Sequence, residues 1–317
     1  MPSPGVALVT GGTGFIGSHL VERLLEDDWV VHVAARPGSA GERLRPYQDR
    51  ITFHRGSIGE TRFARKVIDA SRPTIVFHLA NRTDLRHAGA EVRSSIESVN
   101  VGLLGTLHLI EAAEEYQVQR LIRLGGLEEY GGGAGAVEEQ RERPVSPYSA
   151  GQVAATHYGQ MLQRHMACTL VTLRPALVYG PGQGVDFFIP ALIHACLRGH
   201  DFRLSPGDPW RDLLYVTDLI EAMRRTVYAP RLSGEVINLG SGREYRMADV
   251  AERIIRKTGA SIRLVASDEC GGPPELLHLS GRIDRAADLL GWRPATTLEE
   301  GLRRTVAWYR TEHESGS

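Results

Sequence analysis

The chain has little of what marks several common classes of protein. Its 317 residues include three cysteines. Cys168, Cys196 and Cys270 stand apart in the sequence, which predicts neither a disulfide framework nor a metal site. The formal net charge of −1 gives no electrostatic basis for binding nucleic acid or an anionic membrane. No apolar run reaches the ~20 residues of a transmembrane helix, and no secretory signal is visible. We therefore expect a cytoplasmic protein without nucleic-acid, membrane or metal partners.

The first half of the chain alternates apolar segments with amphipathic ones. Strands are predicted at 6–9, 30–34, 51–54, 74–80, 120–124 and 170–173. Helices are predicted between them at 18–27, 60–70, 91–116 and 147–166. Continuous apolar strands joined by helices indicate a parallel sheet covered on both faces. The sequence thus predicts an α/β, doubly wound (Rossmann) domain over residues 1–178.

The pattern loosens after about residue 180. The remaining predicted elements are a strand at 235–239 and helices at 186–199, 247–258, 284–290 and 298–312. We expect a smaller substrate lobe over residues 179–317, partly threaded back onto the first domain, with ligands bound in the cleft between them. The glycine-rich segment 131–136 is predicted to be a mobile loop.

The segment 11–17, Gly-Gly-Thr-Gly-Phe-Ile-Gly, is the most informative part of the chain. It lies between the first predicted strand and the first predicted helix. Glycines at 11, 14 and 17 permit a tight turn, close approach to a pyrophosphate and close packing of helix on strand. The helix N-terminus supplies N–H donors and a partial positive charge. No Gly-Lys-Ser/Thr follows, so the pattern favours a dinucleotide over a mononucleotide P-loop.

The end of the second strand bears on the choice between NAD and NADP. NAD sites usually carry an acid there that binds the ribose 2′-hydroxyl, whereas residues 34–39 read Ala-Ala-Arg-Pro-Gly-Ser. Arg36 is suited to pair with a 2′-phosphate, which favours NADP(H). NAD(H) stays possible, with Arg36 then a solvated surface residue.

Further blocks extend this pattern along most of the chain. They lie at 11–17, 75–80, 100–106, 146–148, 173–182, 211–218 and 289–292. With these blocks the chain resembles an extended short-chain dehydrogenase/reductase of the nucleotide-sugar epimerase/dehydratase type. The resemblance implies a nicotinamide cofactor, a nucleoside-diphosphate sugar in the second lobe and a keto intermediate, commonly at the sugar C4. It also implies a homodimer built on the helices near 91–116 and 147–166.

The resemblance also implies which residues contact the ligands. The implied cofactor residues are Gly11, Thr13, Gly14, Phe15, Ile16, Gly17, Arg36, Ser57, Ile58, Leu79, Ala80, Asn81, Asn100, Tyr148, Gln152 and Pro175. The implied substrate residues are Gly126, Leu177, Arg211 and Arg282. Leu177 replaces a usual asparagine, Arg282 a usual aspartate, and Ser57 a frequent aspartate that binds the adenine amino group. Arg211 and Arg282 are candidates to hold the diphosphate, or alternatively form salt bridges between the lobes.

The catalytic residues depart from the family pattern. The family places a lysine four residues after its acid/base tyrosine, and here Tyr148 is followed by Gln152. A phenol ionises near pH 10, and the lysine ammonium normally favours the phenolate. Gly126 stands where a Ser/Thr hydroxyl is usual. Glu128 matches a glutamate that dehydratases and decarboxylases of the family place near the sugar; the alternative is that Glu128 and Glu129 form one solvated pair.

These departures favour some reactions over others. Oxidising a hydroxyl needs a base, whereas reducing a ketone needs a proton donor, which a neutral tyrosine already is. We therefore expect NADPH-dependent keto-sugar reduction with Tyr148 as the acid. The alternatives are a 4-epimerase or 4,6-dehydratase with tightly bound cofactor and Glu128 as the C5 base, or a binding protein that has lost catalysis. His78 is expected in the core, and His87 is a weaker candidate for the cleft.

Overall fold

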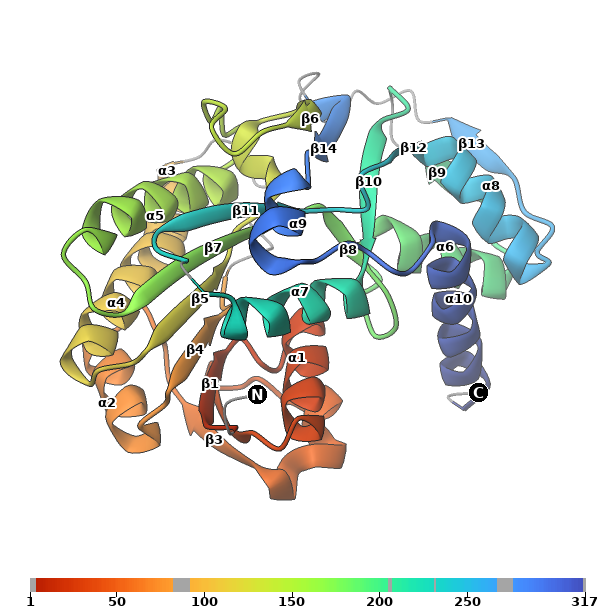
Figure 1. Ribbon diagram of the computed structural model, residues 1–317. Coiled ribbons are helices and arrows are strands. Elements are labelled where there is room, and N and C mark those ends of the chain that lie inside the picture. The colour runs from red at the N-terminus through yellow and green to blue at the C-terminus, as the bar shows by residue number, and fades with distance from the viewer. Residues whose placement is uncertain (1–3, 82–91, 205–206, 231, 267–275, 316–317) are drawn as a thin grey trace.

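The computed structural model describes residues 4–81, 92–204, 207–230, 232–266 and 276–315. Its largest element is a seven-stranded parallel sheet in the order β11-β7-β5-β4-β1-β2-β3 (Figure 1). The strands are β1 (Val6–Thr10), β2 (Val30–Ala35), β3 (Ile51–Arg55), β4 (Ile75–His78), β5 (Arg120–Leu124), β7 (Thr169–Pro175) and β11 (Glu235–Leu239). The strand order reverses at β1 and β4, which confirms the predicted doubly wound fold.

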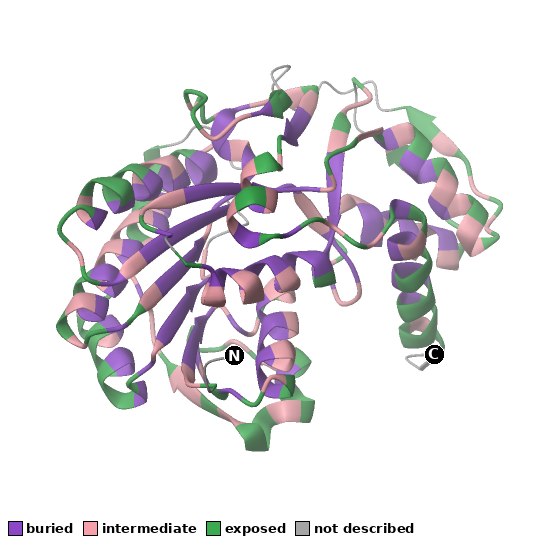
Figure 2. Ribbon diagram, viewed as in Figure 1, coloured by how far each residue is buried: buried purple, intermediate pink, exposed green. Residues whose placement is uncertain are grey.

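Helices cover both faces of this sheet because its strands are apolar on both faces. One face packs against α2 (Thr61–Ser71), α4 (Gly105–Glu115) and α5 (Pro147–Gln163), the other against α1 (Phe15–Glu26) and α7 (Val216–Tyr228). Alternate residues of β1 enter separate cores: Ala7 and Val9 join one, and Leu8 joins the other. Figure 2 shows the strands of this sheet buried along most of their length, except the edge strand β3. The helix α7 has no counterpart among the predicted elements.

The helix predicted at 91–116 is divided. Its described part consists of α3 (Val92–Ser98), a π-helical segment η3 (Val99–Leu104) and α4. The η3 segment packs against α5, where the Ser98 hydroxyl donates to the Pro147 carbonyl at 2.5 Å. The spacing of apolar residues in the sequence does not distinguish a π-helical segment from a continuous α-helix.

The second lobe carries two smaller sheets and its own core. Its strands are β8 (Leu177–Tyr179), β9 (Phe202–Leu204), β10 (Trp210–Tyr215), β12 (Glu244–Arg246), β13 (Leu264–Ala266) and β14 (His278–Gly281). Its helices are α6 (Phe188–Arg198), α8 (Met247–Thr258) and α10 (Leu298–Ser315), whose apolar side chains form this core. The helix α9 (Asp284–Leu290) instead packs beside β11 and adds Ala286 and Leu290 to a core of the large sheet. The two predicted ranges interleave, because β11 returns to the large sheet beside β7.

The prediction that the glycine-rich segment 131–136 is a mobile loop is wrong. Residues Gly133–Ala136 form a strand, β6, rather than a mobile loop, and β6 pairs with β14 (Figure 1). The Gly135 N–H donates to the Ser280 hydroxyl at 2.8 Å, and the Arg282 N–H donates to the Ala136 carbonyl at 2.9 Å. A distant partner strand therefore orders a segment whose composition favours a turn. Within the described residues, η1 (Glu42–Arg50) and η4 (Leu127–Tyr130) are 3₁₀ helices in the connections.

Among the described residues, no helix is both long and apolar enough to cross a membrane.

Candidate active site

A cleft of about 410 Å³ opens at the carboxyl ends of the large sheet. Most of the residues predicted to hold a cofactor line it: Gly11, Thr13, Gly14, Phe15, Ile16, Gly17, Arg36, Ser57, Ile58, Leu79, Ala80, Asn81, Tyr148, Gln152 and Pro175, together with Leu177. The structure adds lining residues that the motifs did not single out, among them Ser39, Arg43, Gly56, Gly125, Gln183 and Asp186. They come from loops and from η1, whose positions depend on the tertiary fold.

The glycine turn leaves no room for side chains at two of its positions. Gly11 has a φ of +72°, and a Cβ atom there would lie 2.8 Å from the Ala80 nitrogen. A Cβ atom on Gly17 would lie 2.2 Å from the Gly11 carbonyl oxygen. The first glycine therefore permits the turn, and the last lets α1 pack onto it.

The N-terminus of α1 faces the cleft and is suited to an anion. Its N-cap residue is Gly14, no side chain caps the first turn, and that turn contains no acid. Backbone N–H groups and the helix dipole are thus available to a phosphate, as a dinucleotide pyrophosphate requires. Phe15 and Ile16 add apolar surface to the same wall.

Two exposed basic side chains line the cleft beyond the end of β2. Arg36 directly follows the strand, and Arg43 lies on η1, where its Nε donates to the Gly182 carbonyl at 3.0 Å. The Ser39 hydroxyl donates to the Thr13 hydroxyl at 2.8 Å, so this loop is joined to the glycine turn. Arg55 donates to the Ser39 carbonyl at 2.7 Å. The rim beside the predicted ribose position thus carries positive charge and a hydroxyl.

Tyr148 and Gln152 project from the first turns of α5. Ser146 caps this helix by accepting from the Ser149 N–H, and Pro147 occupies its first turn. The spacing of four residues places Tyr148 and Gln152 on one helical face. Both are buried, with 5% and 2% of their surface exposed. The Gln152 Nε2 atom lies 3.1 Å from the Leu124 carbonyl oxygen and 3.5 Å from the Tyr148 hydroxyl.

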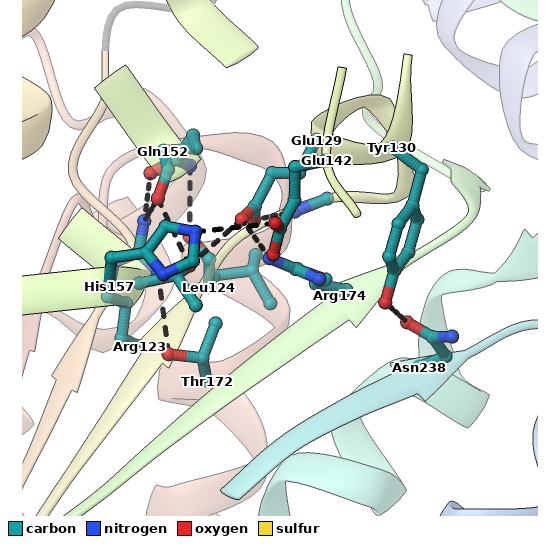
Figure 3. A network of polar contacts seen from close by, with 12 residues as sticks. Arg123, Leu124, Glu129, Tyr130, Glu142, Gln152, His157, Thr172, Arg174 and Asn238 are labelled. Atoms are coloured by element: carbon teal, nitrogen blue, oxygen red, sulfur yellow. Dashed lines mark hydrogen bonds and ion pairs between the residues drawn. The ribbon is translucent and has the colours of Figure 1, made fainter. Parts of the chain in front are cut away.

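Arg123 lies on the other side of the Gln152 side chain. Its guanidinium donates to the Gln152 side-chain oxygen, and it also donates to the Gln152 main-chain carbonyl at 3.0 Å (Figure 3). Arg123 is on β5, and 1% of its surface is exposed. The sequence motifs do not point to Arg123, because a charged residue within a central apolar strand matches no recognised functional pattern.

Glu128 and Glu129 have different environments, so the solvated-pair interpretation is wrong for Glu129. Its carboxylate is buried and accepts hydrogen bonds from Gly126 N–H at 3.1 Å, Thr156 Oγ1 at 2.9 Å and Arg174 Nη2 at 2.7 Å. The Arg174 charge and these donors replace water around the carboxylate. Glu128 is half-buried.

The same carboxylate explains one of the two glycines before it. A Cβ atom on Gly125 would lie 2.2 Å from Glu129 Oε1, whereas one on Gly126 would have its nearest neighbour at 4.0 Å. The structure therefore requires glycine at 125 but has space for a side chain at 126. The hydroxyl expected at Gly126 is missing for reasons other than crowding.

Arg211 lies in the second lobe and interacts with Glu128. Its guanidinium donates to the carbonyls of Trp210 at 2.8 Å and Leu277 at 3.2 Å. Burial lowers the pKa of Arg211, and the charges of Glu128 and Glu244 oppose this shift. A carboxylate from the first lobe and a guanidinium from the second are thus electrostatically coupled.

The remaining predicted residues lie elsewhere. Arg282 is exposed, pairs with Asp284 at 2.8 Å and lines a separate depression that also contains Glu138 and Glu139. Asn100 is exposed on η3 and is not part of the cleft lining. His87 lies outside the described residues.

His78 is buried at the end of β4, which confirms the expected core position. Its ring contacts the Thr10 hydroxyl at 2.8 Å and the Thr106 hydroxyl at 3.2 Å. Burial, and secondly the charge of Arg123, lower the pKa of His78 to about 3. The imidazole is therefore neutral at physiological pH.

Comparison with known proteins agrees with this geometry. The sequence profile of the NAD dependent epimerase/dehydratase family matches residues 7–240. The chain is 30% identical to a UDP-glucose 4-epimerase of Mycolicibacterium smegmatis, over 97% of this chain and 99% of that protein. The solved structure of a Thermotoga maritima UDP-glucose 4-epimerase with UDP-glucose superposes with a TM-score of 0.89, at 27% identity, covering 97% of this chain and 99% of that one.

A second solved structure carries a different activity on the same fold. A dTDP-glucose 4,6-dehydratase of Bacillus anthracis in complex with NAD gives a TM-score of 0.85 at 26% identity, covering 98% of this chain and 97% of that one. Epimerases and dehydratases thus share the architecture of this chain across nearly its full length. The glycine turn, the cleft and the position of Tyr148 together with these matches show that the chain belongs to the NAD dependent epimerase/dehydratase family, within the extended short-chain dehydrogenases/reductases.

Proposed function

We propose that this protein reduces a keto group on a nucleoside-diphosphate sugar, with NADPH as the hydride donor and Tyr148 as the proton donor. The observation that carries the proposal is the basic rim of the cleft, which Arg36, Ser39 and Arg43 line together. A 2′-phosphate is best bound by such guanidinium groups and hydroxyls. NADPH binds, gives up its hydride and leaves as NADP, which suits a net reduction. A reaction that returns the hydride to its substrate has no need of an exchangeable cofactor.

The surroundings of Tyr148 support its role as the acid. The nicotinamide, when bound, supplies the hydride. Gln152 Nε2 can only donate to the Tyr148 oxygen. The Tyr148 O–H is the group that we expect to donate to a substrate oxygen in the cleft. A positioned general acid of this kind contributes roughly 10²–10⁴-fold to a rate.

The test supplies a 4-keto sugar nucleotide and NADPH to the purified protein. We expect NADPH consumption in proportion to alcohol product, and loss of that activity in Tyr148→Phe. Product formed without net consumption of the cofactor counts against reduction. Cofactor binding without any turnover, unaffected by Tyr148→Phe, points instead to a protein that only binds the dinucleotide.

A second candidate is 4-epimerisation or 4,6-dehydration with a retained cofactor. The observation in its favour is the half-buried Glu128, which is coupled to Arg211 across the lobes. A carboxylate near the sugar is the base that removal of a C5 proton needs. Exchange of the C5 hydrogen with solvent deuterium, abolished by Glu128→Gln, would favour 4,6-dehydration over simple reduction. A C4 epimer formed without net consumption of the cofactor would favour 4-epimerisation.

We also propose a homodimer. Large apolar side chains are exposed on α3, η3 and α5: Val92, Ile96, Val99, Tyr158 and Met161. Grouped apolar surface of this kind favours burial against another protein. Light scattering should show two copies for the wild type and one for a Tyr158→Glu, Met161→Glu double variant. A wild-type protein that is monomeric at micromolar concentration overturns the proposal.

A further inference from the structure

Arg123 occupies a place where a charge has a mechanistic consequence. Its guanidinium is buried under α5, and its hydrogen-bond partners are neutral oxygens of Gln152, Thr156 and Thr172. Figure 3 shows it beside the Gln152 side chain. The family's lysine position and this arginine thus adjoin, although they are separated by 29 residues in sequence.

The contacts of the Gln152 amide fix its orientation. Arginine only donates hydrogen bonds, so the amide oxygen must face Arg123. The Leu124 carbonyl only accepts, so the amide nitrogen must face Leu124, 3.1 Å away. The second hydrogen on that nitrogen is directed to the Tyr148 oxygen through a long hydrogen bond of 3.5 Å.

We propose that Arg123 is a positioning residue that replaces the absent lysine charge, acting on Tyr148 through the polarised amide of Gln152. The inference rests on the proposed role of Tyr148 as the proton donor. When Tyr148 gives up its proton it becomes a phenolate. A cation on the far side of a donating amide stabilises that phenolate, because hydrogen bonds in a chain polarise one another.

The other charged and titratable groups around Arg123 are consistent with this role. Glu129 and Tyr148 attract its charge and Arg174 repels it, while burial is the main cause that lowers the pKa of Arg123. The Glu129 carboxylate is already engaged by Arg174 at 2.7 Å. His78, on the adjacent strand β4, is neutral at physiological pH and contributes no competing charge.

The primary test follows the ionisation of Tyr148 in the cofactor-free protein, which needs no turnover. Ultraviolet difference absorption during an alkaline titration, with the Tyr148→Phe curve subtracted, isolates this residue from the other tyrosines. We expect Arg123→Met to raise the midpoint by about one pH unit, the lower end of what a nearby opposite charge produces. Gln152→Met, which removes the amide and keeps Arg123, should raise it as well.

Two further variants separate charge from packing. Arg123→Met combined with Gln152→Lys returns a cation to the lysine position and should restore the wild-type midpoint. Arg120→Met is the matched control, because Arg120 lies on the same strand and donates to main-chain carbonyls of residues 226, 227 and 229. That control should leave the Tyr148 midpoint unchanged.

Turnover provides a second measurement. Arg123→Met should lower kcat about tenfold and move the alkaline limb of the kcat–pH profile to higher pH, whereas loss of packing alone lowers kcat without moving the limb.

A folded Arg123→Met protein with an unchanged Tyr148 midpoint overturns the inference, as does an equal shift in Arg120→Met. If Arg123→Met does not fold, Gln152→Met decides by the same criterion. Failure of the proposed function is seen separately, as full reductase activity in Tyr148→Phe.

Discussion

Arg174 Nη2 lies 2.7 Å from a Glu129 carboxylate oxygen, and neither side chain has more than 1% of its surface exposed. Arg174 is also within 2.9 Å of Glu142, and its guanidinium carbon lies 4.6 Å from the centre of the Tyr130 ring. Burial acts to lower the pKa of Arg174, but Glu129 and Tyr130 reverse the direction, so it is raised. This pair joins η4 to β7 beside α5, whose Thr156 hydroxyl also donates to Glu129.

Breaking that pair should be costly. Removing one partner of a buried ion pair leaves the other charge desolvated, at a cost of about 3–5 kcal/mol. We expect Arg174→Met to lower the free energy of unfolding by that amount in urea denaturation. The exposed pair Arg72–Asp69 provides the control, because Asp69→Asn should change stability by less than about 1 kcal/mol. Equal effects of the two substitutions would contradict the interpretation.

The basic rim predicts a cofactor preference. We expect Arg36→Ala to weaken NADPH binding by about tenfold or more, because it removes a charged hydrogen-bond donor worth ~1.5–3 kcal/mol. NADH binding should change little, since NADH lacks the 2′-phosphate. Fluorescence titration measures both affinities. Arg45→Ala is the control, because Arg45 is exposed on η1 and outside the cleft lining; equal weakening of NADPH and NADH would exclude 2′-phosphate recognition.

His78 predicts a loss of stability in acid. Its pKa is about 3 in the folded protein and near 6.5 when unfolded. The unfolded chain therefore binds the proton first, and stability present above pH ~6.5 is lost as pH falls toward 3. This residue should contribute a loss of about 2 kcal/mol between roughly pH 7.5 and pH 5.

Urea denaturation at several pH values measures that slope. His78→Gln should flatten it, because glutamine does not titrate. His165→Gln, at an exposed histidine, should not. An unchanged slope in folded His78→Gln would show that other groups govern the acid response.

Substitution of the adjacent glycines 125 and 126 should have different effects on stability. Gly125→Ser forces a side chain against Glu129 and should cost about 1–3 kcal/mol of stability. Gly126 has extended backbone and open space around it, so Gly126→Ser should change stability by less than about 0.5 kcal/mol. Thermal unfolding compares the two. The hydroxyl added at 126 should also raise kcat/KM for the keto sugar, and a fall in that ratio would argue against substrate contact there.

Local sequence patterns were sufficient for the strands of the large sheet and for the helices α1, α2 and α5. The turn 11–17 and the alternation of apolar strands with helices predicted the doubly wound sheet, because strand and helix periodicities are set by near neighbours in sequence. The spacing of four residues placed Tyr148 and Gln152 on one face for the same reason.

The tertiary structure decided what depends on distant partners. The sequence determined that an altered Tyr148–Gln152 pair stands in a dinucleotide-binding fold. The fold determined that Arg123 lies against Gln152, that Glu129 is buried on Arg174, and that β6 pairs with β14. These contacts join segments tens of residues apart or more, so no local period encodes them; they form only when the sheet brings neighbouring strands and helices together.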